Sequence, residues 1–285
     1  MNPPDIDRII ARVDDLPTLP RTVLRITELV NDPKSSARDL ARIITDDQVL
    51  AARLLKLVNS SFYGFPQRIS TITGAIVLLG FDAIRNLLLT TSVFDLFSNR
   101  KKISMIRQEQ FWDHSLGCAV GAKVIGHHLR YDKVEELFVS GLLHDIGKIV
   151  EMIFIPDAFK EINQLIRDDN ILMIAAEEKI LGYSHPLVGK LLAERWNLPP
   201  KLISVILHHH RPSEAGPFVQ EASIVHLADI LCRSLNIGYG GDNKMPALDK
   251  TAWDSMRIKP QAIESILAEI NKEFDEISLF ITYTP

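Results

Sequence analysis

Apolar residues recur every three or four positions along most of the chain, and this spacing is the strongest constraint on its fold. Between residues 36 and 58, the apolar side chains that follow the spacing of a one-sided helix are Leu40, Ile43, Ile44, Leu50, Leu54, Leu57 and Val58. Alternating apolar and polar residues, which indicate strands, are scarce. The sequence therefore predicts an all-α fold, a compact array of many short helices without significant sheet.

Interruptions of this pattern divide the chain into elements. We expect breaks near Asp46 and Asp47 and at Gly80, an internal boundary in the polar and basic residues 99–107, and a loose glycine-rich segment at 236–246. An N-terminal helical bundle is expected at 1–98, a second subdomain at 108–236, and a loop with a C-terminal helical extension at 237–285. The expected helices are 36–58, 71–97, 108–130, 133–155, 157–168, 171–181, 184–195, 199–209, 218–236 and 260–280.

Composition narrows the class of protein. Of 285 residues, 46% are hydrophobic and 24% charged, with a net charge of −4, so neither a nucleic acid nor an anionic membrane is an expected partner. Two cysteines cannot form a disulfide framework, which favours a reducing compartment. The chain shows no signal-peptide pattern and no apolar run near the ~18–20 residues that span a bilayer. We expect a cytoplasmic protein.

The histidines are spread unevenly, and this points to chemistry. All nine lie between residues 114 and 226. Imidazole and carboxylate groups are ligands of divalent zinc, iron, manganese and nickel, and a helical protein gathers them from several helices. His114, His144, Asp145 and Asp229 fall on three expected helices and are predicted to bind one ion, with room for water or a phosphate oxygen.

A second group of histidines follows the first. His185 begins a helix, and His209 and His210 end another, so these three side chains are candidates for holding a second ion about 3.5–4 Å from the first, the spacing of two-metal phosphoryl chemistry. Lys148 lies four residues after His144, on the same expected helix face, where it could contact an anionic ligand.

Several of these residues have a plainer interpretation. His127, His128, His208 and His226 are expected to be ordinary core or surface histidines, and His144 with Asp145 could be only a hydrogen-bonded helix pair. Cys118 lies four residues from His114 and Cys232 three from Asp229, so each could share a face with a ligand. A free cysteine is nevertheless most often a small buried hydrophobe, and we interpret both in this way.

The order of these motifs resembles the HD superfamily of helical metal-dependent phosphohydrolases, and residues 16–235 resemble its HDOD branch, an output domain of bacterial signalling proteins. The matching stretches are "LPTLPRTVLRITELVNDP" (16–33), "LAARLLKLVNSSFYGF" (50–65), "ISTITGAIVLLGFDAIRNLLL" (69–89), "GLLHDIGKIV" (141–150), "EEKILGYSHPLVGKLLAERWNLP" (177–199), "ILHHHRP" (206–212) and "IVHLADIL" (224–231).

The resemblance carries its own expectations for the site. It makes His114, His144, Asp145 and Asp229 the ligands of a first metal, and the related HD-GYP enzymes, which cleave cyclic di-GMP, add histidines that match His185, His209 and His210. Glu177 matches an acidic position ahead of His185 more weakly. HD-GYP enzymes follow the histidine pair with a Glu and a Gly-Tyr-Pro loop, whereas this chain continues "RPSEAGPFVQ".

Two functions follow from the resemblance. The preferred one is a regulatory, signal-transducing HDOD protein that retains the metal site, lacks cyclic di-GMP phosphodiesterase activity and binds a signalling protein. The alternative is a metal-dependent phosphohydrolase of a nucleotide or cyclic dinucleotide, in which Asp145 and Lys148 would serve catalysis. One or two divalent ions are expected, with iron or manganese preferred over nickel or zinc, and a phosphate or nucleotide could bind beside them.

Overall fold

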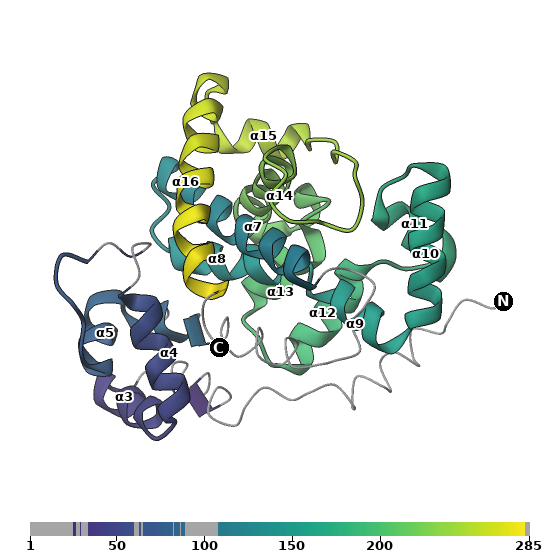
Figure 1. The fold of residues 1–285 in the computed structure, drawn as a ribbon. Helices are drawn as coiled ribbons and strands as arrows, with labels where there is room; N and C mark the ends of the chain where they lie inside the picture. The colour runs from purple at the N-terminus through teal and green to yellow at the C-terminus, as the bar shows by residue number, and fades with distance from the viewer. Residues whose placement is uncertain are drawn as a thin grey trace. The chain divides into compact units, whose positions relative to one another are not determined.

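Every secondary-structure element that the computed structural model describes is helical, which confirms the predicted all-α class (Figure 1). The described residues are 25–26, 29, 34–59, 63, 65–81, 83–85, 87–88 and 108–282. The α-helices are α3 (Ala37–Thr45), α4 (Gln48–Val58), α5 (Ile72–Leu79), α7 (Gln108–His128), α8 (Val134–Leu143), α9 (Ile146–Phe154), α10 (Pro156–Asp169), α11 (Met173–Leu181), α12 (His185–Arg195), α13 (Pro200–His208), α14 (Val219–Ser234), α15 (Lys250–Met256) and α16 (Ile263–Thr282). Three short 3-10 helices are η1 (Pro212–Glu214), η2 (Gly216–Phe218) and η3 (Pro260–Ala262).

The chain divides into two compact units. The smaller unit holds the described residues of 17–99 and 271–285, and the larger unit holds those of 100–270. In the smaller unit, the apolar faces of α3, α4 and α5 form one core with the chain around Leu87 and Leu88. The predicted break at Asp46 and Asp47 separates α3 from α4, and Gly80, at φ 87°, ends α5 as predicted. The predicted boundary at 99–107 lies outside the described residues.

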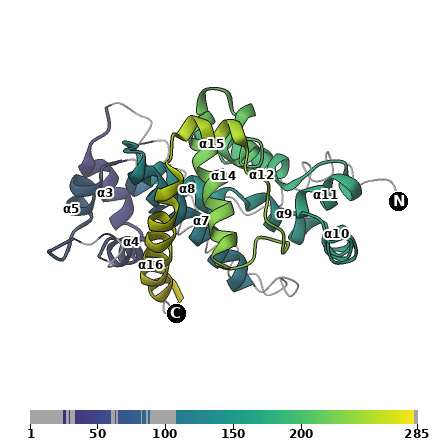
Figure 2. The same cartoon turned by 90° about the horizontal axis from the view of Figure 1, so that it is seen from above.

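The larger unit is built on two groups of packed helices. α7 packs against α8 and α14, and α12 packs against α9 and α13 (Figure 2). Glycines permit the closest approaches: a Cβ on Gly141 would lie 2.5 Å from the Cys118 carbonyl oxygen of α7, and one on Gly147 would overlap the His185 carbonyl oxygen of α12. Both glycines flank the sequence His144-Asp145, so this segment is held between the two helix groups.

One expected helix is wrong. The predicted continuous helix over 133–155 is two helices, α8 and α9, which meet at His144 and Asp145. Asp145 has φ −100° and ψ 12°, outside the helical region, so the chain changes direction between the two residues. The apolar pattern continues through the junction and therefore gives no sign of the break.

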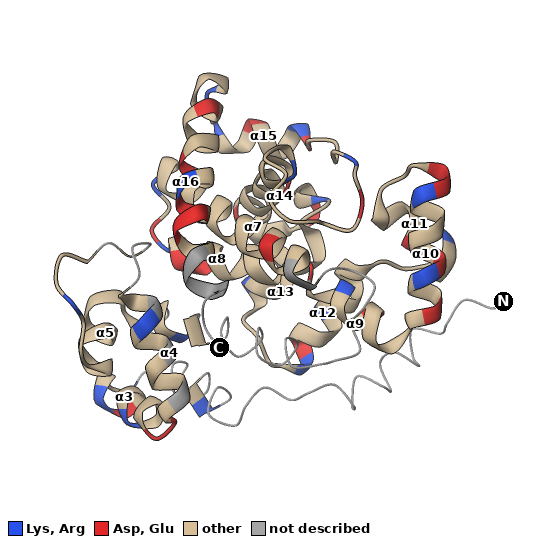
Figure 3. Ribbon diagram, in the orientation of Figure 1, with Lys and Arg blue, Asp and Glu red and all other residues tan. Residues whose placement is uncertain are grey.

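Charged residues of both signs are interspersed along the helices, as α10, α11 and α16 illustrate (Figure 3). Among the described residues, none of the helices has the length and apolar character needed to cross a bilayer.

Candidate metal centre

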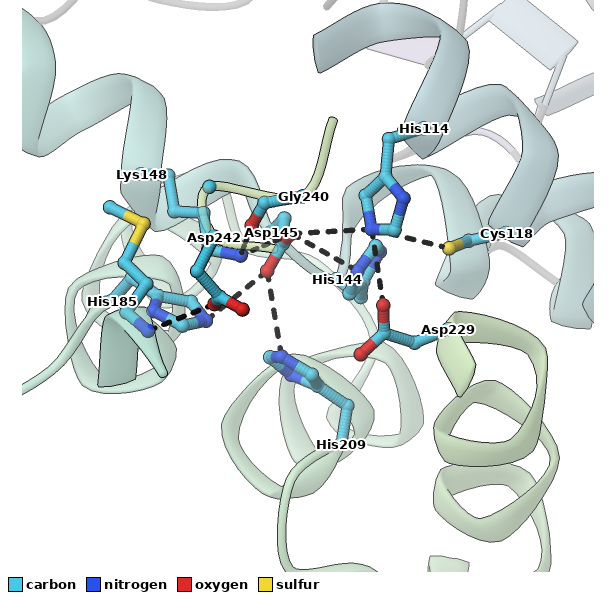
Figure 4. Close-up of polar contacts among 12 residues, drawn as sticks. His114, Cys118, His144, Asp145, Lys148, His185, His209, Asp229, Gly240 and Asp242 are labelled. Atoms are coloured by element: carbon cyan, nitrogen blue, oxygen red, sulfur yellow. Dashed lines mark hydrogen bonds and ion pairs between the residues drawn. The ribbon is translucent and has the colours of Figure 1, made fainter. Parts of the chain in front are cut away.

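At the junction of α8 and α9, the neighbouring side chains of His144 and Asp145 point into one site. The His144 Nδ1–H donates to the carbonyl oxygen of Gly141 at 2.6 Å, which leaves the Nε2 lone pair facing inward (Figure 4). Because the helix breaks at this point, His144 and Asp145 are not constrained to diverge by about 100°, the angle between neighbours on a continuous helix. His144 Nε2 and Asp145 Oδ2 lie 3.3 Å apart.

A first set of potential metal ligands forms around His144. His114 and Cys118 come from α7, and Asp229 comes from α14. His114 Nε2 lies 3.2 Å from Asp229 Oδ1 and 3.6 Å from Cys118 Sγ. One ligand atom from each of these four buried residues lies within 4.8 Å of the others. His114, Cys118, His144 and Asp229 are called the first set below.

A second set forms on the other side of Asp145. His185 begins α12, and His209 and His210 directly follow α13. Asp145 Oδ1 lies 3.1 Å from His185 Nε2 and 3.6 Å from His209 Nε2. His210 Nε2 lies 3.2 Å from His185 Nε2. Asp145, His185, His209 and His210 each offer a ligand atom within 4.8 Å of the others and are called the second set.

Asp145 lies between the two sets. Its Oδ1 faces the second set, whereas its Oδ2 lies 3.3 Å from His144 Nε2 and 3.8 Å from His114 Nε2. A carboxylate placed in this way can share its two oxygens between two cations. The geometry thus brings all seven predicted metal ligands together around Asp145.

Two imidazoles have the hydrogen-bonding state of metal ligands. His209 Nδ1 donates to the Ile206 carbonyl at 2.9 Å, as His144 Nδ1 does to Gly141. The Nε2 atoms of His144 and His209 are buried and have no hydrogen-bond partner among the described residues. Buried polar atoms are ordinarily paired, and a backbone-bound Nδ1 with a free Nε2 is the arrangement of a histidine that binds a metal. The residues therefore fit a divalent cation.

The electrostatics of the two carboxylates and of His209 favour a bound cation, whereas nearby carboxylates outweigh burial, raise the pKa of His185 and favour its protonated form until a metal binds. Burial opposes the charged form of Asp145, but His144 and Lys148 outweigh it and hold the pKa of Asp145 well below its usual range. Burial likewise opposes ionisation of Asp229, and Arg233, 2.8 Å away, lowers the pKa of that carboxyl well below its usual range. Burial lowers the pKa of His209 to about 4. At neutral pH these groups are ionised carboxylates and a neutral imidazole, the forms that coordinate metals.

Two residues outside the predicted ligand set hold histidines in place. Glu177 Oε2 accepts hydrogen bonds from His185 Nδ1 at 2.7 Å and from its backbone N–H at 2.9 Å, which directs His185 Nε2 toward Asp145. His226 Nδ1 donates to the His209 carbonyl at 2.8 Å. The sequence pattern offered a weak match for Glu177 and no signal for His226, which we interpreted as an ordinary core residue.

Lys148 and a glycine-rich loop close the site from one side. Lys148 Nζ donates to Asp145 Oδ2 at 2.6 Å and to the Gly240 carbonyl at 2.7 Å. Gly238 has φ +62°, and a Cβ there would overlap the His114 backbone nitrogen. Asp242, also buried, accepts from the Met173 N–H at 2.9 Å and from Arg233 Nη1 at 3.1 Å. This part of the segment predicted to be loose is thus fixed against the site.

The ligands are closed off from solvent. His114, His144, Asp145, His185, His209 and Asp229 are each at most 2% exposed, and His210 alone among the seven is partly exposed. His127 and His128 lie at the exposed end of α7, away from the site, where His128 pairs with Glu269.

Comparison with known proteins decides the family. The HDOD domain model matches residues 16–212. The chain belongs to the HDOD family. The match contains every predicted metal ligand except Asp229, and it covers the segment where α8 meets α9.

Solved structures share the fold of this HDOD protein. An HDOD domain protein with unknown function from Geobacter sulfurreducens is 30% identical, with a TM-score of 0.77 over 98% of this chain and 99% of that one. A candidate phosphohydrolase from Shewanella amazonensis SB2B is 24% identical, with a TM-score of 0.74 over 95% of this chain and 97% of that one. At that identity the second structure supports the fold alone.

A curated relative is longer than this chain. An uncharacterized protein of Treponema pallidum (strain Nichols) is 27% identical over an alignment of 227 residues, which covers 77% of this chain and 43% of the relative. The HDOD protein therefore spans less than half the length of that relative.

Proposed function

We propose that this HDOD protein binds two divalent metal ions, one on each side of Asp145, and uses the loaded site in signalling rather than in hydrolysis. The observation that carries the proposal is the position of the Asp145 carboxylate between two ligand sets. The buried, unpaired Nε2 atoms of His144 and His209 support it, because cations in these sets would satisfy both.

The regulatory part of the proposal rests on closure of the site. Almost all ligand atoms are buried, and Lys148 is bound to Asp145 and to the Gly240 carbonyl rather than exposed for a phosphate. The segment after His210 forms the two short 3-10 helices η1 and η2, in place of the Glu and Gly-Tyr-Pro loop of the HD-GYP enzymes. We propose a signalling protein as the partner and the cytoplasm as the location.

Each residue has a definite task in this arrangement. Metal ions held by such residues lower the pKa of coordinated water and polarise phosphate oxygens. Glu177 orients His185, the Gly141 and Ile206 carbonyls orient His144 and His209, and Lys148 neutralises part of the charge of Asp145. These contacts keep the ligands in one geometry and exclude water from all of them except His210.

The second candidate function is a metal-dependent phosphohydrolase acting on a nucleotide or cyclic dinucleotide. Asp145 supports it, because a carboxylate between two ligand sets would hold two metal ions side by side, and such a pair would stabilise both the attacking and the leaving oxygen of a displacement at phosphorus. In that case, the loop at Gly238–Asp242 has to open to admit substrate, and Asp145 and Lys148 become the residues to test for catalysis.

Metal analysis of the purified chain tests the binding proposal. Protein prepared without chelators should hold about two ions per chain. Asp145→Ala should lower this clearly, because the second set loses a member and the first set loses a neighbouring carboxylate. His127→Ala, which removes an exposed histidine of α7, is the matched control and should retain the wild-type content. Wild-type protein without bound metal would overturn the proposal.

Turnover measurements separate the two functions. The metal-loaded protein should leave nucleotides, phosphodiesters and cyclic dinucleotides unhydrolysed in the presence of manganese or ferrous iron. Hydrolysis by the wild type that is lost in both His144→Ala and Asp145→Ala, and kept in His127→Ala, would overturn the regulatory role and establish the phosphohydrolase.

A further inference from the structure

Cys118 occupies a place in the first set that the predicted histidine and aspartate ligands do not explain. It lies one helical turn after His114 on α7, its side chain is completely buried, and its Sγ is 3.6 Å from His114 Nε2. Its neighbours in the first set are the same buried groups that would bind an ion, including the unpaired Nε2 of His144 (Figure 4).

Two of the spacings in the first set, both measured from His114 Nε2, match the edges of a tetrahedral site, and the other ligand atoms lie within 4.8 Å of one another. Zinc–nitrogen bonds of about 2.0–2.1 Å and zinc–sulfur bonds of about 2.3 Å put a nitrogen and a sulfur ligand about 3.5 Å apart, and a nitrogen and an oxygen ligand about 3.3 Å apart. The corresponding distances are 3.6 Å from His114 Nε2 to Cys118 Sγ and 3.2 Å from His114 Nε2 to Asp229 Oδ1.

The packing of α8 on α7 maintains this position. Gly141 lies against the backbone of Cys118 and Ala119 so closely that a Cβ would meet the Cys118 carbonyl at 2.5 Å. His144 is bound to the Gly141 carbonyl through Nδ1. The same glycine therefore sets both the closeness of the two helices at Cys118 and the direction of His144 Nε2.

We propose that Cys118 binds the metal of the first set as a thiolate, so that His114, Cys118, His144 and Asp229 form a site that prefers zinc to manganese. This inference rests on the proposed metal centre, and it gives the first and second sets different metal preferences. The S–H proton leaves to water as the ion binds, and a soft thiolate ligand favours zinc, whereas manganese prefers oxygen ligands. The second set contains no sulfur and lacks this preference.

The competing role for Cys118 is a thiol that only fills space and hydrogen-bonds to His114. In that role its sulfur stays protonated, and metal binds without it. The two roles differ in whether sulfur is bonded to the ion, which a spectrum reports directly and independently of any enzymatic activity.

Cobalt titration of the metal-free full-length chain tests the inference. Cobalt bound by a thiolate gives a sulfur-to-metal charge-transfer band in the near ultraviolet, and we expect this band in the wild type. Cys118→Ser should abolish it while cobalt still binds the second set. Cys232→Ser removes the other buried cysteine, which belongs to neither set although its side chain contacts that of Cys118, and should keep the band.

Competition between metals gives a second readout. Cys118→Ser should weaken zinc binding at the first set by at least about 10-fold, because loss of a group that only orients a ligand already costs about 10–100-fold. The same change should affect manganese binding much less. Equal losses for zinc and manganese would overturn the proposed selectivity.

The outcomes distinguish this inference from the proposed metal centre. Stoichiometric cobalt binding without a sulfur band overturns the role of Cys118 and leaves the metal centre standing. Absence of cobalt and zinc binding overturns both. If Cys118→Ser does not fold, X-ray absorption of the zinc-loaded wild type decides, since a sulfur scatterer at about 2.3 Å supports the inference and its absence overturns it.

Discussion

Single residues at the centre act through the direction in which each nitrogen or oxygen points. Asp145 contacts both ligand sets because its two oxygens face different histidines. His144 and His209 point their Nε2 atoms into the site because a backbone carbonyl accepts a hydrogen bond from each Nδ1. Glu177 orients His185 in the same way, but the acceptor is a carboxylate rather than a carbonyl. Its negative charge strengthens the hydrogen bond and raises the basicity of the imidazole.

Removal of Glu177 should therefore weaken one half of the centre. Glu177→Ala should lower metal affinity at the second set by about 10–100-fold, because His185 loses the group that orients it. Competition with a chelator measures the change. Glu178→Ala is the matched control, since this neighbour is exposed and pairs with Arg211 at the surface. Equal affinities for Glu177→Ala and Glu178→Ala would contradict the account.

Sequence reasoning named the candidate ligands at this scale, but it matched Glu177 only weakly and gave no signal for the supporting role of His226. Residue type alone shows which side chains can bind a metal, and this made five candidates recognisable: His114, His144, Asp145, His185 and Asp229. Glu177 and His226 act through contacts made only after folding, and Cys118 resembles any buried small side chain until its distance from His114 is known.

At the scale of elements, close helix packing places the ligands. α9 and α12 approach at Gly147 and Gly189, which brings Asp145 beside His185. The sequence predicted helices in both regions, but it predicted one helix over 133–155. The break at His144 lies between the close approaches at Gly141 and Gly147, and an apolar pattern that continues from α8 into α9 does not encode it.

Gly147→Ala tests the importance of this approach. The new Cβ would overlap the His185 backbone, which cannot move aside cheaply, so we expect a loss of about 1–3 kcal/mol in the unfolding free energy of the larger unit. All three tryptophans lie in this unit, so urea unfolding followed by tryptophan fluorescence reports on it.

Gly189→Ala is the comparison. Its Cβ would meet chiefly the Ile206 methyl group at 2.8 Å, and the gain of about 1 kcal/mol in helix propensity offsets part of the strain. The account is contradicted if Gly189→Ala destabilises the unit more than Gly147→Ala does.

The loop at Gly238–Asp242 lies against the centre, and we expect it to control access to the metal. Asp242→Ala removes acceptors for the Met173 N–H, the Lys244 N–H and Arg233, and bonds to a charged group contribute about 1.5–3 kcal/mol each. We expect a chelator to strip metal at least about 10-fold faster, since the loop opens more often. Lys244→Ala changes an exposed side chain two residues after this loop and should leave the rate unchanged. An unaltered rate in Asp242→Ala would show that metal escapes by another route.

For the whole molecule, both ligand sets lie within one of the two compact units. All residues of both ligand sets belong to the larger unit, whereas the smaller unit has its own apolar core from α3, α4 and α5. A ligand that binds only the folded state stabilises what it binds, by about 4 kcal/mol at a thousand times its dissociation constant. Metal should therefore stabilise one unit selectively.

Hydrogen exchange measures this selectivity. Metal loading should slow exchange in α7, α8, α9, α12, α13 and α14, which carry or flank the ligands, and should leave α3, α4 and α5 unchanged. Equal protection of α3–α5 would mean that the smaller unit is coupled to the centre, contrary to this account.

Anomalous X-ray diffraction from crystals of the metal-loaded chain tests the central claim most directly. The account predicts two metal peaks about 3.5–4 Å apart, one among His114, His144 and Asp229 and one among His185, His209 and His210, with Asp145 between them. A metal-loaded crystal without a peak beside Asp145 would contradict it.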